Sequence, residues 1–134
     1  MGALSMRLLL DTCAFIWLCS APEQFSAVAT KVLQGDVDID LYLSDASILE
    51  IALKSSLGKL SLSNDPRSWI EEQSGIWNVK SLPITHEVIY ISANLPKHHK
   101  DPFDRLIIAA SKVNNLPIVT SDRFFASYGC EVIW

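Results

Sequence analysis

The sequence predicts an α/β fold of three layers, in which helices cover both faces of a central parallel sheet of about five strands. Two observations predict it. Short apolar segments alternate with helical patterns along the chain, and crossover helices are what connect parallel strands. The strand-like segments 8–10 and 118–119 are apolar throughout, as strands are when both faces of their sheet are buried.

The elements follow in a regular order. Five segments have the length and composition of strands: 7–11, 39–43, 78–82, 117–120 and 130–133. Seven helical patterns lie between them: 12–19, 22–33, 44–56, 65–74, 85–94, 101–114 and 122–127. Residues 65–66 and 101–102 are both Asp-Pro, a capping side chain followed by a proline in the first helical turn. Ser44 or Asp45 caps the third helix, and Gly58 ends it.

Size and composition limit the classes of protein. The 134 residues suit one domain, residues 6–134, with a real core. We expect residues 1–5 to be a disordered leader or cloning remnant, with Met6 as a candidate natural start. The sequence has no signal-peptide pattern and no membrane-spanning apolar run, so we expect a cytoplasmic protein without membrane contact. Three cysteines without CxxC spacing predict buried thiols in a reducing compartment, with no disulfide framework.

Acidic residues stand where apolar stretches stop. Asp11 and Asp122 follow strand-like runs, whereas Glu50 and Asp104 lie in helices that are otherwise apolar. Ligands of open α/β sheets bind outside the carboxyl ends of the strands, so these side chains can converge at one edge. Four converging carboxylates need a cation, and hard oxygen ligands suit Mg²⁺ or Mn²⁺. The pattern therefore favours a metal-dependent phosphoryl-transfer site. The net charge of −4 argues against a generic nucleic-acid coat, but less against such a nuclease.

Each acid also has an ordinary structural explanation. Asp11 could cap the next helix, although Thr12 is available for that role. Glu50 could pair with Lys54 one helical turn later. Asp104 suits the first turn of its helix. Likewise, Asp122 or Ser121 could cap the last short helix. One shared site explains all four acids more economically than four separate roles.

Other polar patterns do not fit a metal motif. Asp36, Asp38 and Asp40 lack the glycine and glutamate of a calcium-binding loop. The adjacent histidines 98–99 point apart and have no third histidine at helical spacing, so we expect them in an exposed loop, 97–100. That loop immediately precedes the helix of Asp104 and could touch phosphate. The four tryptophans are expected in the core or at interfaces.

Three segments resemble a known family. Residues 7–18 (RLLLDTCAFIWL) resemble the first strand and helix of PIN domains. Residues 98–110 (HHKDPFDRLIIAA) resemble the helix of the third acid in VapC-type bacterial toxins of that family. Residues 116–125 (LPIVTSDRFF) resemble the strand and turn of the fourth acid, and Glu50 lies in the helix where the family has its second.

The resemblance implies a PIN-like fold and an endoribonuclease with one or two Mg²⁺ or Mn²⁺ ions. It implies a homodimer that cuts RNA and is neutralised by a small cognate antitoxin. The metal-binding and catalytic residues that it implies are Asp11, Glu50, Asp104 and Asp122. Thr120 matches a position where the family often has a hydroxyl near the metal, and Ser121 could assist it.

The chemistry of phosphodiester hydrolysis suggests roles for these residues. We expect Asp11 and Asp104 to hold the principal metal, Glu50 to orient or deprotonate the attacking water, and Asp122 to complete the site or hold a second ion. Positive side chains near the acids are candidates for steering RNA phosphates towards the site: Arg105, Arg123, Lys97 and Lys100.

Three rival functions remain open. A phosphoacceptor receiver domain also has an acidic α/β pocket, but it needs a lysine at the end of a late strand, and segments 117–120 and 130–133 have none. A pure binding module would leave the acids catalytically silent. A PIN nuclease of RNA processing would have the same site without an antitoxin.

Overall fold

The computed structural model contains a five-stranded parallel sheet with the strand order β3-β2-β1-β4-β5. It describes residues 6–35 and 38–134. The strands are β1 (Met6–Leu10), β2 (Ile39–Ser44), β3 (Val79–Leu82), β4 (Ile118–Val119) and β5 (Val132–Ile133). β1 lies in the centre of the sheet, between β2 and β4. Because both neighbours run parallel to it, the carboxyl ends of β1, β2 and β4 reach the same edge.

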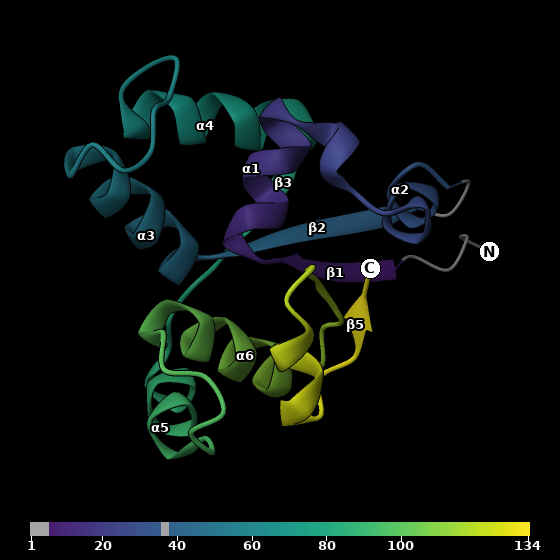
Figure 1. The fold of residues 1–134 in the computed structure, drawn as a ribbon, viewed down its shortest axis with the longest axis vertical. Helices are drawn as coiled ribbons and strands as arrows, with labels where there is room; N and C mark the ends of the chain where they lie inside the picture. The colour runs from purple at the N-terminus through teal and green to yellow at the C-terminus, as the bar shows by residue number, and fades with distance from the viewer. Residues whose placement is uncertain (1–5, 36–37) are drawn as a thin grey trace.

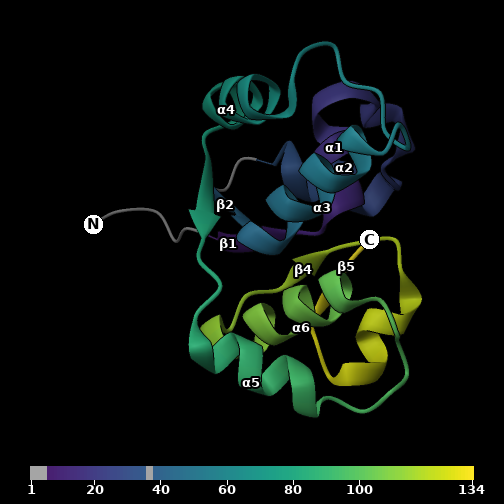
Figure 2. The same cartoon turned by 90° about the vertical axis from the view of Figure 1, so that its left-hand side faces the viewer.

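Helices cover both faces of this sheet (Figures 1 and 2). On one face lie α1 (Thr12–Ser20), α2 (Ala27–Leu33), α3 (Asp45–Ser56) and α4 (Pro66–Trp77), with the short 3₁₀ helix η1 (Pro22–Gln24). On the other lie α5 (His86–Asn94), α6 (Pro102–Asn114) and the 3₁₀ helix η2 (Arg123–Tyr128). The predicted three-layer α/β/α fold with a parallel sheet is thus confirmed.

The core is divided by the sheet because successive strand residues point to opposite faces. Leu8 and Leu10 of β1 pack with Phe15 and Ile51 in one cluster. Leu9 belongs to the second cluster, which contains the apolar face of α6. All three leucines are fully buried, which explains why the strand reads as an unbroken apolar run.

Some predicted boundaries were wrong. The single helix expected over 22–33 is two helices, because Ser26 starts α2 by accepting a hydrogen bond from the amide of Ala29 (3.0 Å). The helix expected to end near residue 74 continues to Trp77, where Asn78 ends it in the left-handed conformation. The expectation of buried thiols is wrong, because Cys13 is exposed and Cys19 and Cys130 are only half-buried.

Two expectations concern residues outside the described part of the chain. They are the disordered leader at 1–5 and the approach to the second strand at Asp36. Across the described residues, no helix is both long enough and apolar enough to cross a membrane.

Candidate metal centre

Asp11 follows β1 directly, and both of its carboxylate oxygens accept hydrogen bonds. Oδ1 accepts from the amide of Ala14 (2.7 Å), so Asp11 is the cap of α1 and the alternative cap, Thr12, is not used. Oδ2 accepts from the hydroxyl of Thr120 (2.6 Å). Burial raises the pKa of Asp11 to about 6, despite these hydrogen bonds, and the nearby negative charges of Asp122 and Glu50 add to the shift.

Thr120 connects Asp11 to Asp122 at the end of β4. Its side chain is completely buried, and its hydroxyl accepts a hydrogen bond from the amide of Asp122 (3.0 Å) while donating to Asp11. Asp122 in turn caps η2, because Oδ1 accepts from the amide of Phe124 (2.9 Å). Its Oδ2 remains directed towards α6. Ser121 is exposed.

Glu50 is buried in the second turn of α3. Its Oε1 accepts a hydrogen bond from the hydroxyl of Thr12 (2.7 Å), which lies 2.9 Å from the hydroxyl of Ser47. Its Oε2 forms an ion pair with Lys54, one turn later in the same helix. The ordinary explanation for Glu50 is therefore realised, yet the carboxylate also faces the start of α1. The hydrogen bond with Glu50 raises the pKa of Lys54.

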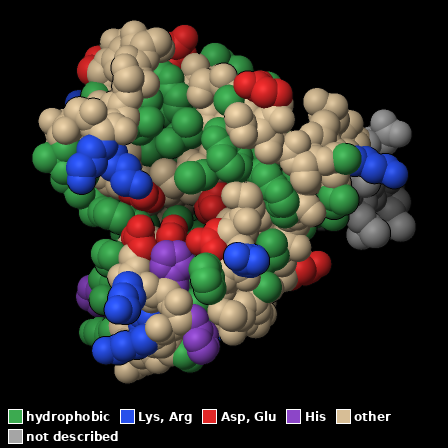
Figure 3. All heavy atoms as spheres, viewed as in Figure 1, with side chains coloured by type: hydrophobic (Ala, Val, Ile, Leu, Met, Phe, Trp, Pro, Cys, Tyr) green, Lys and Arg blue, Asp and Glu red, His purple; other side chains and the backbone are tan. Residues whose placement is uncertain are grey.

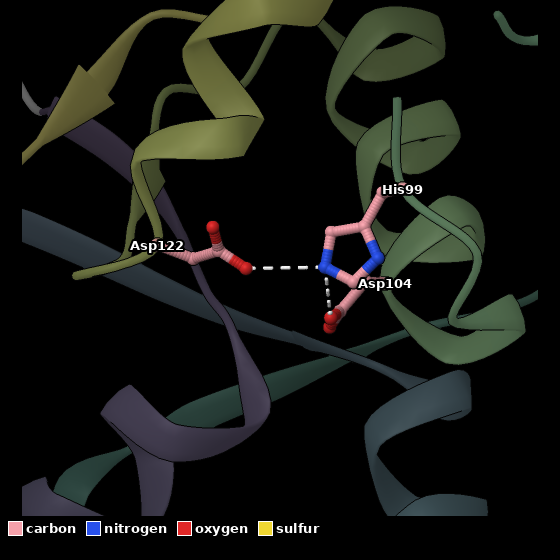
Figure 4. Close-up of side chains that lie close together, drawn as sticks. All are labelled: His99, Asp104 and Asp122. Atoms are coloured by element: carbon pink, nitrogen blue, oxygen red, sulfur yellow. Dashed lines mark hydrogen bonds and ion pairs between the residues drawn. The ribbon is translucent and has the colours of Figure 1, made fainter. Parts of the chain in front are cut away.

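Asp104 lies in the first turn of α6, which Asp101 caps. Its Oδ2 is 2.9 Å from Nε2 of His99, and Oδ2 of Asp122 is 3.1 Å from the same nitrogen (Figure 4). Burial and the negative charge of Asp101 raise the pKa of Asp104 to about 7, although His99 opposes the shift. The charges of Glu50 and Asp11 contribute to the same shift, so the four predicted acids lie close enough to influence one another.

His99 is a candidate site residue that the sequence analysis missed. We expected both histidines in an exposed loop, and His98 is exposed, but the side chain of His99 is 19% exposed and contacts two of the acids. The turn at Lys97 and His98 leaves His98 in solvent and directs the ring of His99 towards the acids. The signal was the spacing from His99 to the Asp-Pro helix start two residues later.

Arg105, one of the predicted steering residues, also binds the loop between α5 and α6. Its guanidinium donates hydrogen bonds to four backbone carbonyl oxygens, which belong to Ser92 (2.8 Å), Leu95 (2.8 Å), Pro96 (2.9 Å) and His99 (3.1 Å). These bonds fix the loop between α5 and α6, and Arg105 also lines an open pocket with Lys97 and Lys100. The other three candidates for steering are exposed: Lys97, Lys100 and Arg123.

The carboxylates fit a hard divalent cation. Oxygen atoms of Asp104 and Asp122 lie within 4.8 Å of each other and of a ring nitrogen of His99, and the Asp11 carboxylate is joined to Asp122 through Thr120. In the space-filling view, acidic side chains gather in a hollow with a histidine beside them and lysine or arginine side chains around its rim (Figure 3). Ionising buried carboxylates without a cation is costly, as the raised pKa values of Asp11 and Asp104 indicate.

Solved structures share this fold. One is VapBC2 from Rickettsia felis, bound to a DNA fragment from its own promoter. It is 12% identical, with a TM-score of 0.65, and the match covers 95% of this chain and 97% of that one. VapBC-1 from nontypeable Haemophilus influenzae is 18% identical, with a TM-score of 0.65 over 95% and 96%. VapBC-5 from Mycobacterium tuberculosis, a member of the VapBC family of toxin-antitoxin systems, is 18% identical, with a TM-score of 0.58 over 95% and 97%.

Sequence comparison adds the family. Among curated proteins, no sequence matches this chain significantly. The pattern of the PIN domain matches residues 8–129, which includes every acid of the site and nearly the whole sheet. This chain therefore belongs to the PIN domain family, a family of nucleases.

Proposed function

We propose that this protein is a metal-dependent endoribonuclease and the VapC-type toxin of a type II toxin–antitoxin pair, with residues 6–134 as one nuclease domain. One observation carries the nuclease proposal. Asp11, Asp104 and Asp122 come from three separate elements, yet a single hydroxyl and a single imidazole connect them at the carboxyl edge of the sheet. Glu50 faces the same place from α3.

The acids would divide the work of hydrolysis among them. Asp11 and Asp104 would hold a Mg²⁺ or Mn²⁺ ion, with Asp122 completing the site or holding a second ion. The bound cation would supply positive charge to the phosphate oxygens and lower the pKa of the attacking water. Glu50 would orient that water or take its proton, and the hydrogen bond from Thr12 to Oε1 fixes the direction of its carboxylate. Thr120 would hold Asp11 in place, with Ser121 beside it.

RNA must approach an acidic pocket, and positive charges at its rim would favour this approach. Lys97, Lys100 and Arg123 are exposed on the loops that precede Asp104 and follow Asp122. We propose that they contact phosphates on either side of the bond that is cut, since oriented surface charge speeds the encounter of a charged ligand.

Partner binding is supported by apolar side chains on α3. Leu49 and Leu53 are 48% and 44% exposed on one face of the helix that carries Glu50, and Leu57, the residue that caps the end of this helix, is 66% exposed. We propose that this cytoplasmic protein forms a homodimer and binds a small cognate antitoxin. Light scattering of the purified chain measures the dimer, and a monomer at micromolar concentration would contradict it.

The test is cleavage of RNA by the purified protein with Mg²⁺ or Mn²⁺, followed by sequencing of the new RNA ends. Cleavage should stop with EDTA and in Asp104→Asn, which removes a charge without changing shape. The control is Glu72→Gln, an exposed acid on α4, which should cut as the parent does. Cleavage by Asp104→Asn at the parent rate would overturn the assignment.

The rivals give different results in related experiments. Labelling of the protein by a small phosphodonor would indicate a receiver domain, and cation binding without any cleavage would indicate a binding module. Growth arrest on expression, relieved by a small protein encoded beside this one, distinguishes a toxin from a nuclease of RNA processing.

A further inference from the structure

His99 is held in place by four separate contacts. Its amide donates to the hydroxyl of Tyr128 (2.6 Å), and its carbonyl oxygen accepts from Arg105 (3.1 Å). Its ring packs edge-on against Phe124 and Phe125, with centroid distances of 6.3 and 6.2 Å. A side chain fixed from the backbone outwards in this way loses little entropy when it binds. The imidazole is therefore built into the site.

The hydrogen bonds of the ring define which nitrogen carries its proton. Nδ1 accepts a hydrogen bond from the amide of Asp101 (3.2 Å), so Nδ1 has no proton of its own. In the neutral imidazole the proton is then on Nε2, which makes Nε2 a donor. Both atoms that face Nε2 are carboxylate oxygens, which accept: Oδ2 of Asp104 at 2.9 Å and Oδ2 of Asp122 at 3.1 Å.

From this geometry we propose that His99 is a positioning residue whose Nε2–H holds Asp104 and Asp122 together at the place where a divalent cation binds. The N–H donates to Asp104 and Asp122, which the proposed function assigns to the cation, so the N–H and the cation would compete for these carboxylates. This inference rests on the cation site of the proposed function, and it assigns that site a built-in competitor.

The alternative is that His99 is itself a ligand, and the structure disfavours it. A ligating Nε2 needs its lone pair, which would move the proton to Nδ1. Nδ1 would then face the amide of Asp101, placing one donor against another. The two assignments predict opposite effects when the imidazole is removed. Removing a competitor should strengthen cation binding, whereas removing a ligand should weaken it.

Titration of the EDTA-treated protein with Mn²⁺ distinguishes the competitor from the ligand. Binding is measured as the loss of the paramagnetic resonance signal of free Mn²⁺. His99→Phe keeps a ring between Phe124 and Phe125 and removes the N–H. We expect it to bind Mn²⁺ about tenfold more tightly than the parent, about 1.4 kcal/mol. The matched control is His98→Phe, because His98 is exposed, packs on Tyr128 and should bind Mn²⁺ as the parent does.

Other outcomes overturn the inference in distinguishable ways. Weaker binding by His99→Phe identifies a ligand, and unchanged binding identifies a structural side chain. A parent that binds no Mn²⁺ overturns both this inference and the proposed cation site. Binding by the parent with no gain in His99→Phe overturns the inference alone.

A second measurement needs no variant and does not depend on how His99→Phe folds. Long-range ¹H–¹⁵N correlation spectra of the parent report which ring nitrogen is protonated. We expect His99 to be protonated on Nε2 before and after saturation with Mg²⁺, while its ¹H and ¹⁵N shifts change as the carboxylates leave. Transfer of the proton to Nδ1 with Mg²⁺ would identify a ligand and overturn the proposal.

Discussion

The hydroxyl of Thr120 donates a 2.6 Å hydrogen bond to Oδ2 of Asp11, although 109 positions separate the two residues in the sequence. β1 and β4 are neighbours in the sheet, with Leu10 paired to Val119, so the residues that follow them meet at one edge. Parallel pairing thus delivers the first and last acids of the site to the same place. The same hydroxyl accepts a hydrogen bond from the amide of Asp122, so Thr120 connects Asp11 to Asp122.

Removing this hydroxyl should weaken the fold and the site together. Thr120→Val keeps the shape of a fully buried side chain but leaves Oδ2 of Asp11 without its donor. We expect the free energy of unfolding to fall by about 2 kcal/mol. Urea titration measures it, with Ser121→Ala at the exposed neighbouring position as the control. Equal stability of Thr120→Val and the parent would show that the hydrogen bond does not support Asp11.

The ion pair of Glu50 with Lys54 can be compared with an exposed pair of the same spacing. The side chain of Glu50 is 6% exposed, whereas Arg67 and Glu71 are 87% and 70% exposed. Lys54→Met should lower the free energy of unfolding by about 1–2 kcal/mol, because a buried carboxylate loses its partner. Arg67→Met should cost less than about 0.5 kcal/mol. If Lys54→Met and Arg67→Met lower the free energy of unfolding equally in urea titrations, burial of Glu50 does not strengthen its dependence on Lys54.

The raised pKa values predict how stability depends on pH. The pKa of Asp11 is raised from 3.8 to about 6 and that of Asp104 from 3.8 to about 7. Between about pH 4 and about pH 7 the folded chain therefore binds more protons than the unfolded chain, so the stability contributed by these groups falls as pH rises. In EDTA, the parent should lose more stability between about pH 4 and about pH 7 than Asp11→Asn/Asp104→Asn.

The double variant is the control for this pH dependence, because it keeps all other titrating groups. A loss of stability that is equal in the parent and the double variant would mean that neither carboxyl binds its proton more tightly in the folded state. A divalent cation should reverse the trend, since it replaces the proton as the partner of the carboxylates.

Arg105 should contribute to stability. Arg105→Lys places one point charge where a planar group reached four carbonyl oxygens, so most of these hydrogen bonds are lost. We expect the free energy of unfolding to fall by about 2 kcal/mol and the amides of 97–101 to exchange faster with solvent. The exposed Lys100→Met is the control. An unchanged exchange pattern in Arg105→Lys would show that these hydrogen bonds do not hold the loop.

The steering residues should alter the salt dependence of RNA binding. RNA binding is measured in Asp104→Asn, which should not cut the RNA. For single strands, a plot of log affinity against log salt concentration has a slope of about −0.7 for each phosphate contact. Replacing Lys97, Lys100 or Arg123 by Gln should each reduce the slope by about that amount. Lys31→Gln, on α2 at the opposite end of the sheet, is the control (Figure 1). Slopes equal to the control would exclude these contacts.

The fold followed from local pattern. The all-apolar segment 8–10 and the Asp-Pro helix start at 101–102 predicted a buried parallel strand and the start of α6. Boundaries were less certain, because both Pro22 and Ser26 are suitable helix starts, and the chain uses both. Asp11 is the cap of α1, and the hydroxyl of Thr12 instead donates to the distant carboxylate of Glu50. That contact could not be read from the local sequence.

Residues that act through tertiary contacts were the hardest to predict. His99 faces the site because Tyr128, Arg105 and Asp101 hold its backbone and ring, and these contacts cross up to 29 positions of sequence. Arg105 was expected to contact substrate because its positive charge is visible in the sequence, whereas the four carbonyl oxygens that surround it are not. The acids themselves could be selected because a carboxylate within an apolar pattern needs a partner.

The most direct test of the shared cation site is anomalous diffraction from crystals of the protein grown or soaked with Mn²⁺. We predict a manganese peak within about 2.5 Å of carboxylate oxygens of Asp11 and Asp104, with Asp122 adjoining it. A strong peak elsewhere on the protein at saturating Mn²⁺, with Asp104 and Asp122 still bonded to His99, would contradict the account.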